Sequence, residues 1–174
     1  SFSFVNGELD SMFAPEATSR RITLSNPIDA TQSEMRTTLL SGLLGAVGRN
    51  LNYGTRNLRL FEIGNCFQKL EGAERPLENQ HLALAMTGAR NESDWQGAAT
   101  RVDFYDLKGV VEALAELLGL SSLTFGRAEG LAYLHPERGA VISNGERVVG
   151  HIGQLSPSLA SRLKFKQPIF VAEL

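Results

Sequence analysis

The chain is poor in cysteine, in surplus basic charge and in long apolar runs, and each shortage excludes a class of protein. Cys66 is the single cysteine among 174 residues, so no intrachain disulfide can form, which is typical of a reducing compartment. The 17 basic and 19 acidic residues give a net charge of −2, which argues against nucleic-acid binding through bulk charge. No apolar run approaches the roughly 18–20 residues that span a bilayer. We therefore expect a cytoplasmic protein with no membrane partner.

Signatures of common catalytic and metal sites are missing as well. The sequence has no G-x-x-x-x-G-K-[ST], no G-x-G-x-x-G after a predicted strand, no H-E-x-x-H and no G-x-S-x-G. His81, His135 and His151 lie far apart and lack a second ligand at metal-binding spacing, so structural or surface histidines are the better interpretation. Cys66 lies in a predicted strand, which favours a buried, inert thiol. We expect no catalytic, cofactor-binding or metal-binding residue.

Alternation of polar and apolar residues predicts most of the strands. Asn144-Gly145 predicts a type I′ turn between two of them, because this pair tolerates positive φ angles. The polar stretch 69–80 is predicted to be a loop. The predicted strands cover residues 1–5, 21–24, 58–67, 81–87, 140–143, 147–155 and 169–174.

The first predicted helix lies between the strands 21–24 and 58–67. Apolar residues at helical spacing begin after Thr38, with Thr37 or Thr38 as the N-cap and Gly54 as the end signal. Three glycines repeat at every third position within it, at Gly42, Gly45 and Gly48. Such a thin face favours tight packing against a neighbouring strand or helix.

Two further helices are predicted. One follows Asp103, with Asp106 completing a capping box and Gly119 ending it. A short one begins at Ser156-Pro157. The pattern indicates an α+β fold, an antiparallel β-sheet flanked by helices, for which we expect the helices on one face.

The chain contains no internal repeat and no interdomain linker, so residues 1–174 are predicted to form a single domain. The opening sequence SFSFVNGELD lacks both an initiator methionine and the features of a signal peptide. It starts directly on a strand pattern. We interpret the chain as a piece cut from a longer polypeptide.

One combination of segments is more specific than these patterns. Met35-Arg36-Thr37 is followed by an amphipathic helix and then by the segment LRLFEIGNCF, residues 58–67. This order resembles the motif 2 region of the class II aminoacyl-tRNA synthetases, whose strand ends in G-x-x-F-R-x-E. The resemblance places Gln68 at the position of the family's phosphate-binding arginine and Leu70 at that of its glutamate. Gln68 has no charge and no guanidinium fork, so it cannot replace the arginine.

Further blocks in the same order narrow the resemblance. NPI…MRTTLLSGLL, RLFEIGNCF, VDFYDLKG, LHPERGA, NGERVVGHIGQLSP and PIFVAEL are together similar to the bacterial phenylalanyl-tRNA synthetase beta subunit family. The resemblance implies a non-catalytic domain with the class II synthetase-like core, whose role is assembly with the alpha subunit into a heterotetramer. It also implies contact with the remaining domains of the beta chain and, through the whole enzyme, with tRNA. ATP and magnesium would be used by the whole enzyme and not bound here.

Two other functions stay open at this stage. The domain could retain weak ATP or amino-acid binding, or it could be a stand-alone synthetase paralogue that acts as a regulatory or RNA-binding module. The helix that precedes the first strand in the family is missing, which would leave a packing face of that strand exposed. We therefore predict a partner interface at Ser1, Phe2, Ser3, Phe4 and Val5.

Overall fold

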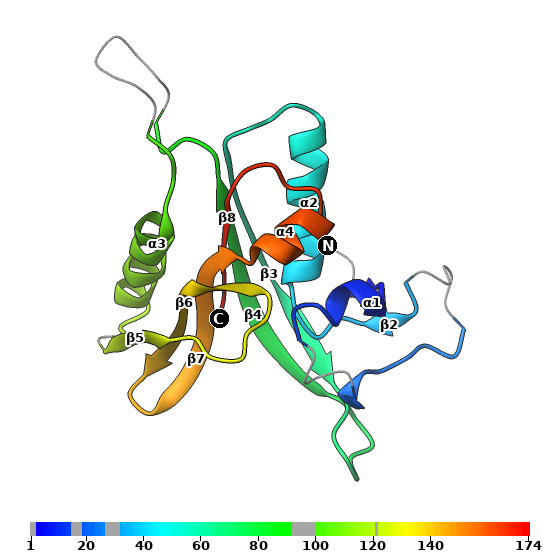
Figure 1. The fold of residues 1–174 in the computed structure, drawn as a ribbon. Helices are drawn as coiled ribbons and strands as arrows, with labels where there is room; N and C mark the ends of the chain where they lie inside the picture. The colour runs from blue at the N-terminus through cyan, green and yellow to red at the C-terminus, as the bar shows by residue number, and fades with distance from the viewer. Residues whose placement is uncertain (1–2, 15–18, 27–31, 92–99, 121) are drawn as a thin grey trace.

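The computed structural model describes residues 3–14, 19–26, 32–91, 100–120 and 122–174. Its centre is a six-stranded antiparallel sheet with the strand order β3-β4-β8-β7-β6-β5 (Figure 1). The strands are β3 (Leu58–Gln68), β4 (Leu77–Thr87), β5 (Leu123–Arg127), β6 (Leu134–Asn144), β7 (Arg147–Leu155) and β8 (Ile169–Glu173). A separate two-stranded sheet pairs β1 (Phe4–Val5) with β2 (Glu34–Met35).

The described residues also form four helices: α1 (Gly7–Asp10), α2 (Leu40–Asn52), α3 (Phe104–Leu117) and α4 (Pro157–Arg162). The two longer ones cover opposite faces of the large sheet, α2 on one side and α3 on the other (Figure 1). The expectation of helices on one face was therefore wrong. None of the helices in the described residues is long and apolar enough to cross a membrane.

Two apolar clusters explain this layered arrangement. Along β4, Ala83 and Ala85 join the cluster beneath α2, while Leu84 and Met86 join the cluster beneath α3. Successive residues of a strand point to opposite faces, so both faces of the central strands are buried. The α+β prediction is confirmed, and the sheet has two covered faces because its central strands are apolar on both sides.

Several boundaries differ from the sequence-based predictions. Strand β4 begins at Leu77, inside the predicted loop 69–80, because β3 and β4 pair over their whole lengths from Leu58↔Thr87 to Gln68↔Leu77. Backbone pairing thus overrides the polar character of these residues. Only an isolated bridge between Thr23 and Glu34 forms in the predicted strand 21–24. Ser1 and Phe2, predicted to open the first strand, lie outside the described residues.

The residues that cap and end the helices lie largely where the sequence predicted them. Asp103 accepts hydrogen bonds from the first turn of α3 and completes a capping box with Asp106. Gly54 and Gly119 follow helix ends with φ angles of 93° and 72°.

The β6–β7 turn differs from the prediction. Gly145 alone has a positive φ, 61°, and Asn144 pairs with Arg147 as part of the ladder. A glycine at the first turn position is typical of a type II′ turn and not of type I′.

Candidate functional site

The β3–β4 hairpin carries the two positions at which the family resemblance places catalytic residues. Gln68 is the last residue of β3, pairs with Leu77 and is half-buried. Leu70 follows β3 with 41% of its surface exposed. Neither side chain carries a charge. Gln68 therefore cannot bind phosphate oxygens as an arginine would, and Leu70 has no carboxylate that could accept a hydrogen bond.

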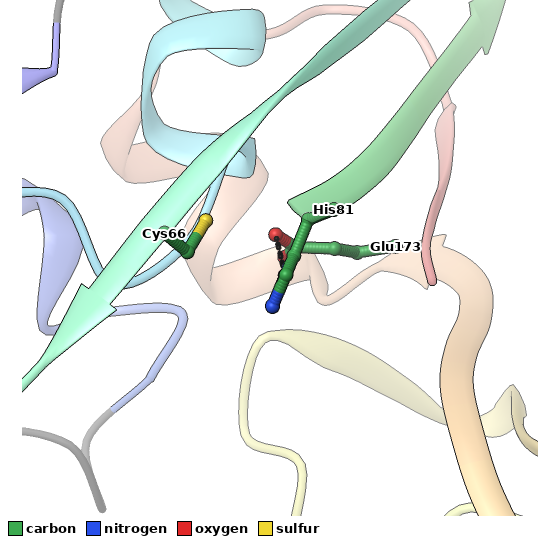
Figure 2. Close-up of side chains that lie close together, drawn as sticks. All are labelled: Cys66, His81 and Glu173. Atoms are coloured by element: carbon green, nitrogen blue, oxygen red, sulfur yellow. Dashed lines mark hydrogen bonds and ion pairs between the residues drawn. The ribbon is translucent and has the colours of Figure 1, made fainter. Parts of the chain in front are cut away.

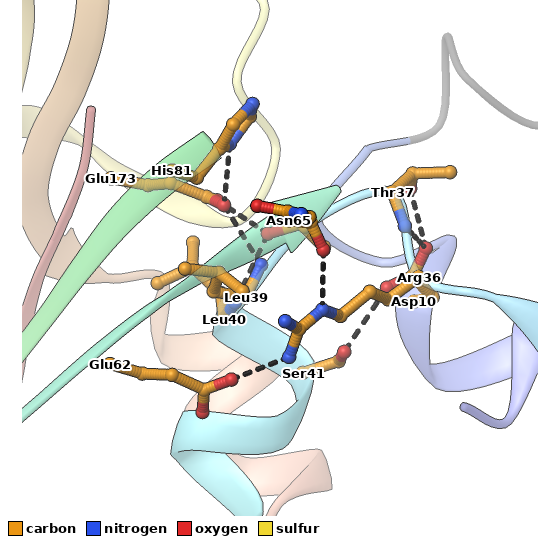
Figure 3. Close-up of polar contacts among 11 residues, drawn as sticks. Asp10, Arg36, Thr37, Leu39, Leu40, Ser41, Glu62, Asn65, His81 and Glu173 are labelled. Carbon is orange, nitrogen blue, oxygen red and sulfur yellow. Dashed lines mark hydrogen bonds and ion pairs between the residues drawn. The ribbon is translucent and has the colours of Figure 1, made fainter. Parts of the chain in front are cut away.

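A cation does lie nearby, but its charge is used inside the protein. Arg36 is buried, with its Nη1 2.6 Å from Oε1 of Glu62 and its Nε donating to the carbonyl oxygen of Asn65 at 2.8 Å (Figure 3). The arginine thereby joins the segment before α2 to strand β3. This role of Arg36 was not predicted, because its partner Glu62 follows 26 residues later and no local spacing indicates the pair.

A buried carboxylate from α1 holds the same segment from the other side. Asp10 is 1% exposed; its Oδ2 accepts from the Thr37 amide at 3.0 Å and from the Thr37 hydroxyl, and its Oδ1 accepts from the Ser41 hydroxyl at 3.1 Å (Figure 3). Burial raises the pKa of Asp10 above its usual value, and the hydrogen bonds from Thr37 and Ser41 oppose that rise. Sequence analysis did not single out this residue.

The amino end of α2 receives a second carboxylate from the last strand. Glu173 accepts from the Leu39 amide at 2.8 Å, from the Thr38 hydroxyl and from His81 Nδ1 at 3.1 Å (Figure 3). The predicted N-cap at Thr37 or Thr38 was displaced to Leu39, whose side chain caps nothing, although the Thr38 hydroxyl still accepts from the Leu40 amide. Orphan amides at a helix start need acceptors, and here distant carboxylates from α1 and β8 supply them.

Cys66 and His81 flank this cap. Figure 2 shows the side chains of Cys66, His81 and Glu173 gathered on the neighbouring strands β3, β4 and β8. Cys66 is 3% exposed, which confirms the prediction of a buried thiol. Burial and, after it, the charge of Glu173 raise the pKa of Cys66 far above its usual range, so the free thiol stays protonated and unreactive at neutral pH.

A cavity of about 500 Å³ opens beside the Arg36–Glu62 pair. Its wall includes Phe4 and Val5 of β1 and the α2 glycines Gly42 and Gly45. Within the part of the chain that the structure describes, no backbone of another element approaches these two glycines: a Cβ added at Gly42 would meet only a carboxylate oxygen of Glu62, at 3.8 Å. The glycine repeat therefore lines open space here, and the prediction of tight packing was wrong for these two positions.

Two shielded arginines, Arg36 in the wall of this cavity and Arg21 beside α1, each lie beside a glutamate. Arg21, with its side chain 9% exposed, donates to the Gly7 carbonyl at 2.7 Å and lies 3.4 Å from Glu34, just as Arg36 is held by Glu62. Arg36 is neutralised by Glu62 and so has little left to offer a phosphate, whereas Nε and Nη2 of the Arg21 side chain have no hydrogen-bond partner among the described residues. Arg36, Asp10 and Glu173 thus hold the fold together around α2, and the exposed Arg49 adds an arginine to the cavity wall.

The sequence of the chain is similar to those of known proteins. The sequence profile described as "Phenylalanyl tRNA synthetase beta chain CLM domain" matches residues 1–174. Phenylalanine–tRNA ligase beta subunits of Geobacter sulfurreducens and Pasteurella multocida are each 38% identical to the chain over 99% of its length. The chain spans only 22% of the length of these relatives.

Comparison with solved structures identifies the fold. A pyrrolysyl-tRNA synthetase from Desulfitobacterium hafniense superposes on the whole chain with a TM-score of 0.71 at 15% sequence identity, and the chain covers 58% of that structure. A second structure of pyrrolysyl-tRNA synthetase from this organism gives a TM-score of 0.72 at 14% identity. At this identity the likeness shows a shared fold, that of a class II synthetase core, as the sequence predicted. The chain belongs to the family of the phenylalanyl tRNA synthetase beta chain CLM domain.

Proposed function

We propose that this domain is a non-catalytic assembly part of the beta subunit of a phenylalanine–tRNA ligase. The ligase attaches phenylalanine to its tRNA with the use of ATP, and its bond-making groups belong to the alpha subunit. Residues 1–174 form one class II synthetase-like domain of a longer beta chain. The whole enzyme works in the cytoplasm as a heterotetramer, binds ATP and magnesium outside this domain, and contacts tRNA through the complete assembly.

The side chain at the former arginine position carries the proposal. This position is taken by the neutral Gln68, and the nearby buried arginine, Arg36, is bound to Glu62 at 2.6 Å. Adenylate formation places negative charge on phosphate oxygens, which a synthetase stabilises with arginine and metal ions. This domain has no guanidinium at position 68 and no glutamate at position 70, so it is suited to a structural role.

The side of the domain that carries β1 and β3 offers the best support for a partner surface. Phe4 is 39% exposed beside the cavity. Strand β3 is an edge of the large sheet within the described residues. Its Phe61 and Ile63 are 69% and 58% exposed, and they flank Glu62, so they lie on the face of β3 opposite to the cavity. Exposed apolar side chains on an edge strand are a liability in a monomer and favour a protein partner. We propose that the alpha subunit binds here.

Co-purification tests this interface. The full-length beta chain is expressed with its alpha subunit, and the complex is measured by size-exclusion chromatography. Phe4→Asp should lower the yield of the complex, because it places a charge in the apolar contact. Leu117→Asp, at an 83% exposed leucine on α3, is the matched control and should assemble normally. Unchanged assembly of Phe4→Asp would remove β1 from the interface.

A further inference from the structure

The fold brings three side chains together that are remote in the sequence. Cys66, His81 and Glu173 each present one ligand atom, and these atoms lie within 4.8 Å of one another (Figure 2). His81 and Glu173 are separated by 92 positions, so no spacing motif could have indicated the group. The interpretation of His81 as a structural or surface histidine rested on spacing along the chain, which does not indicate this cluster.

We propose that Cys66 Sγ, a ring nitrogen of His81 and the carboxylate of Glu173 form a binding site for a divalent transition-metal ion of the zinc type. Thiolate, imidazole and carboxylate are the ligands that zinc prefers, and a site with three protein ligands leaves a fourth position for water or another ligand. The site does not depend on the assembly function. It gives these residues a second use, as metal ligands in addition to the cap of α2.

The distances suit a tetrahedral site after a small adjustment. Metal–ligand bonds of about 2.0–2.3 Å place neighbouring ligand atoms of a tetrahedron roughly 3.3–3.6 Å apart. His81 Nδ1 and Glu173 Oε1 are already 3.1 Å apart. The full set spans at most 4.8 Å, so side-chain shifts of about 1 Å would bring the ligand atoms to tetrahedral spacing.

The surroundings orient the ligands and leave a path for the ion. Glu173 is fixed by the Leu39 amide at 2.8 Å and by the Thr38 hydroxyl, and such outer contacts hold metal ligands in place. The side chains of His81 and Glu173 are 28% and 13% exposed, whereas Cys66 is 3% exposed. An ion can therefore enter beside His81 and reach the buried sulfur.

Charge favours a cation at this point. The Glu173 carboxylate already places a negative charge within 4.8 Å of the Cys66 sulfur. On binding, the thiol proton leaves to solvent and a metal–sulfur bond forms in its place. The thiolate and the carboxylate then balance the two positive charges of the ion, so the buried site becomes neutral overall.

Metal titration of the full-length protein that contains this chain tests the site. The protein is stripped with a chelator and titrated with Zn²⁺ against a chromophoric competitor, and separately with Co²⁺ followed by absorption. Wild type should bind one equivalent more than Cys66→Ala and should show a thiolate-to-cobalt charge-transfer band that this variant lacks. A change in an outer-shell residue typically weakens metal binding by roughly tenfold to hundredfold. His81→Gln should weaken binding at this site by more than that, because it removes a ligand.

Two controls keep the result interpretable. His135→Gln changes a histidine outside the cluster, whose Nδ1 accepts from the Glu137 amide, and it should bind like wild type. Thermal unfolding of each metal-free variant shows whether it is folded, and His81→Gln gives an independent answer if Cys66→Ala is unstable. Equal stoichiometry in wild type and both variants, or a cobalt spectrum without the thiolate band, would overturn the proposal.

Discussion

Two carboxylates, the buried Asp10 and the half-buried Glu173, accept hydrogen bonds from the residues that open α2. Each comes from an element remote in sequence, so the start of this helix depends on tertiary structure and not on its own side chains. A buried acceptor that is removed leaves its donors without partners, which costs about 1–3 kcal/mol. Substitution of either residue therefore tests the whole set of polar contacts between α1, α2 and β8.

Asp10 gives a prediction with a defined pH dependence. Its folded-state pKa is raised above the unfolded value of 3.8, so its contribution to stability is fully present below the unfolded pKa and is lost as pH rises through the folded pKa. Asp10→Asn should remove this loss, because the amide oxygen can accept from Thr37. Denaturant unfolding of wild type and variant between about pH 4 and pH 8, which includes the range in which maximal stability falls, measures the effect.

Asp10→Ala is the contrasting variant. It leaves the Thr37 amide and hydroxyl without an acceptor and should lower the free energy of unfolding by about 1–3 kcal/mol at every pH. If Asp10→Asn loses as much stability as Asp10→Ala, the hydrogen-bonding role of this carboxylate is wrong. A wild-type protein whose stability does not fall relative to Asp10→Asn as pH rises would contradict the sign of the shift.

The Arg36–Glu62 pair predicts a large effect for a single side chain. Both side chains are shielded, with 7% and 15% exposed, so Glu62→Ala leaves a buried guanidinium without its carboxylate. Breaking such a pair costs about 3–5 kcal/mol. Glu112→Ala, which removes the more exposed partner of Lys108 one turn away, should cost about 0.5 kcal/mol or less. Denaturant unfolding compares the two variants, and equal losses would show that Arg36 has another way to be neutralised.

At the scale of the elements, strands β7 and β8 depend on a glycine that lets their backbones approach. A Cβ at Gly150 would lie 2.2 Å from the Glu173 carbonyl oxygen, so Gly150→Ala must displace the strand that carries Glu173. Overpacking of this kind costs about 1–3 kcal/mol. Gly126→Ala in β5, where a Cβ would meet nothing within 4 Å, is the matched control and should change little. Thermal unfolding of both variants makes the comparison, and an unaffected Gly150→Ala would contradict the close approach.

The elements that sequence predicted well are those with local signals. Helix α3 has its cap, its apolar stripe and its terminal glycine between Asp103 and Gly119, and all were predicted. The start of α2 was misplaced, because its acceptors come from Asp10 and Glu173. The first part of β4, from Leu77, was predicted to be loop, because its pairing with β3 has no signature in its own polar residues.

At the scale of the whole molecule, the sequence predicted the α+β class and the family, whereas the polar clusters needed the three-dimensional structure. The assignment of Gln68 and Leu70 to the motif 2 arginine and glutamate positions rests on the sequence motif alone and stays a prediction. Arg36–Glu62, Asp10–Thr37 and Cys66–His81–Glu173 join residues between 15 and 107 positions apart along the chain. Periodicity and local motifs contain no information about such pairs.

The arrangement of the whole domain agrees with an assembly role. Both faces of the central strands are filled by the two apolar clusters, and the buried arginines Arg21 and Arg36 are each paired with a glutamate. The surfaces that we propose for a partner are β1 and the edge strand β3. Catalysis by the complete ligase should therefore be insensitive to the side chain at the former arginine position, as long as the subunits assemble.

Aminoacylation by the assembled enzyme tests this claim most directly. The full-length beta chain with Gln68→Ala is purified in complex with its alpha subunit, and kcat/KM for phenylalanine and ATP is compared with wild type and with the exposed-site variant Gln80→Ala. Removal of a group that stabilises the transition state typically lowers kcat by about 10²–10³, whereas we expect values within about twofold of wild type for both variants. A loss of that larger size in Gln68→Ala, with assembly and Gln80→Ala unaffected, would contradict a non-catalytic domain.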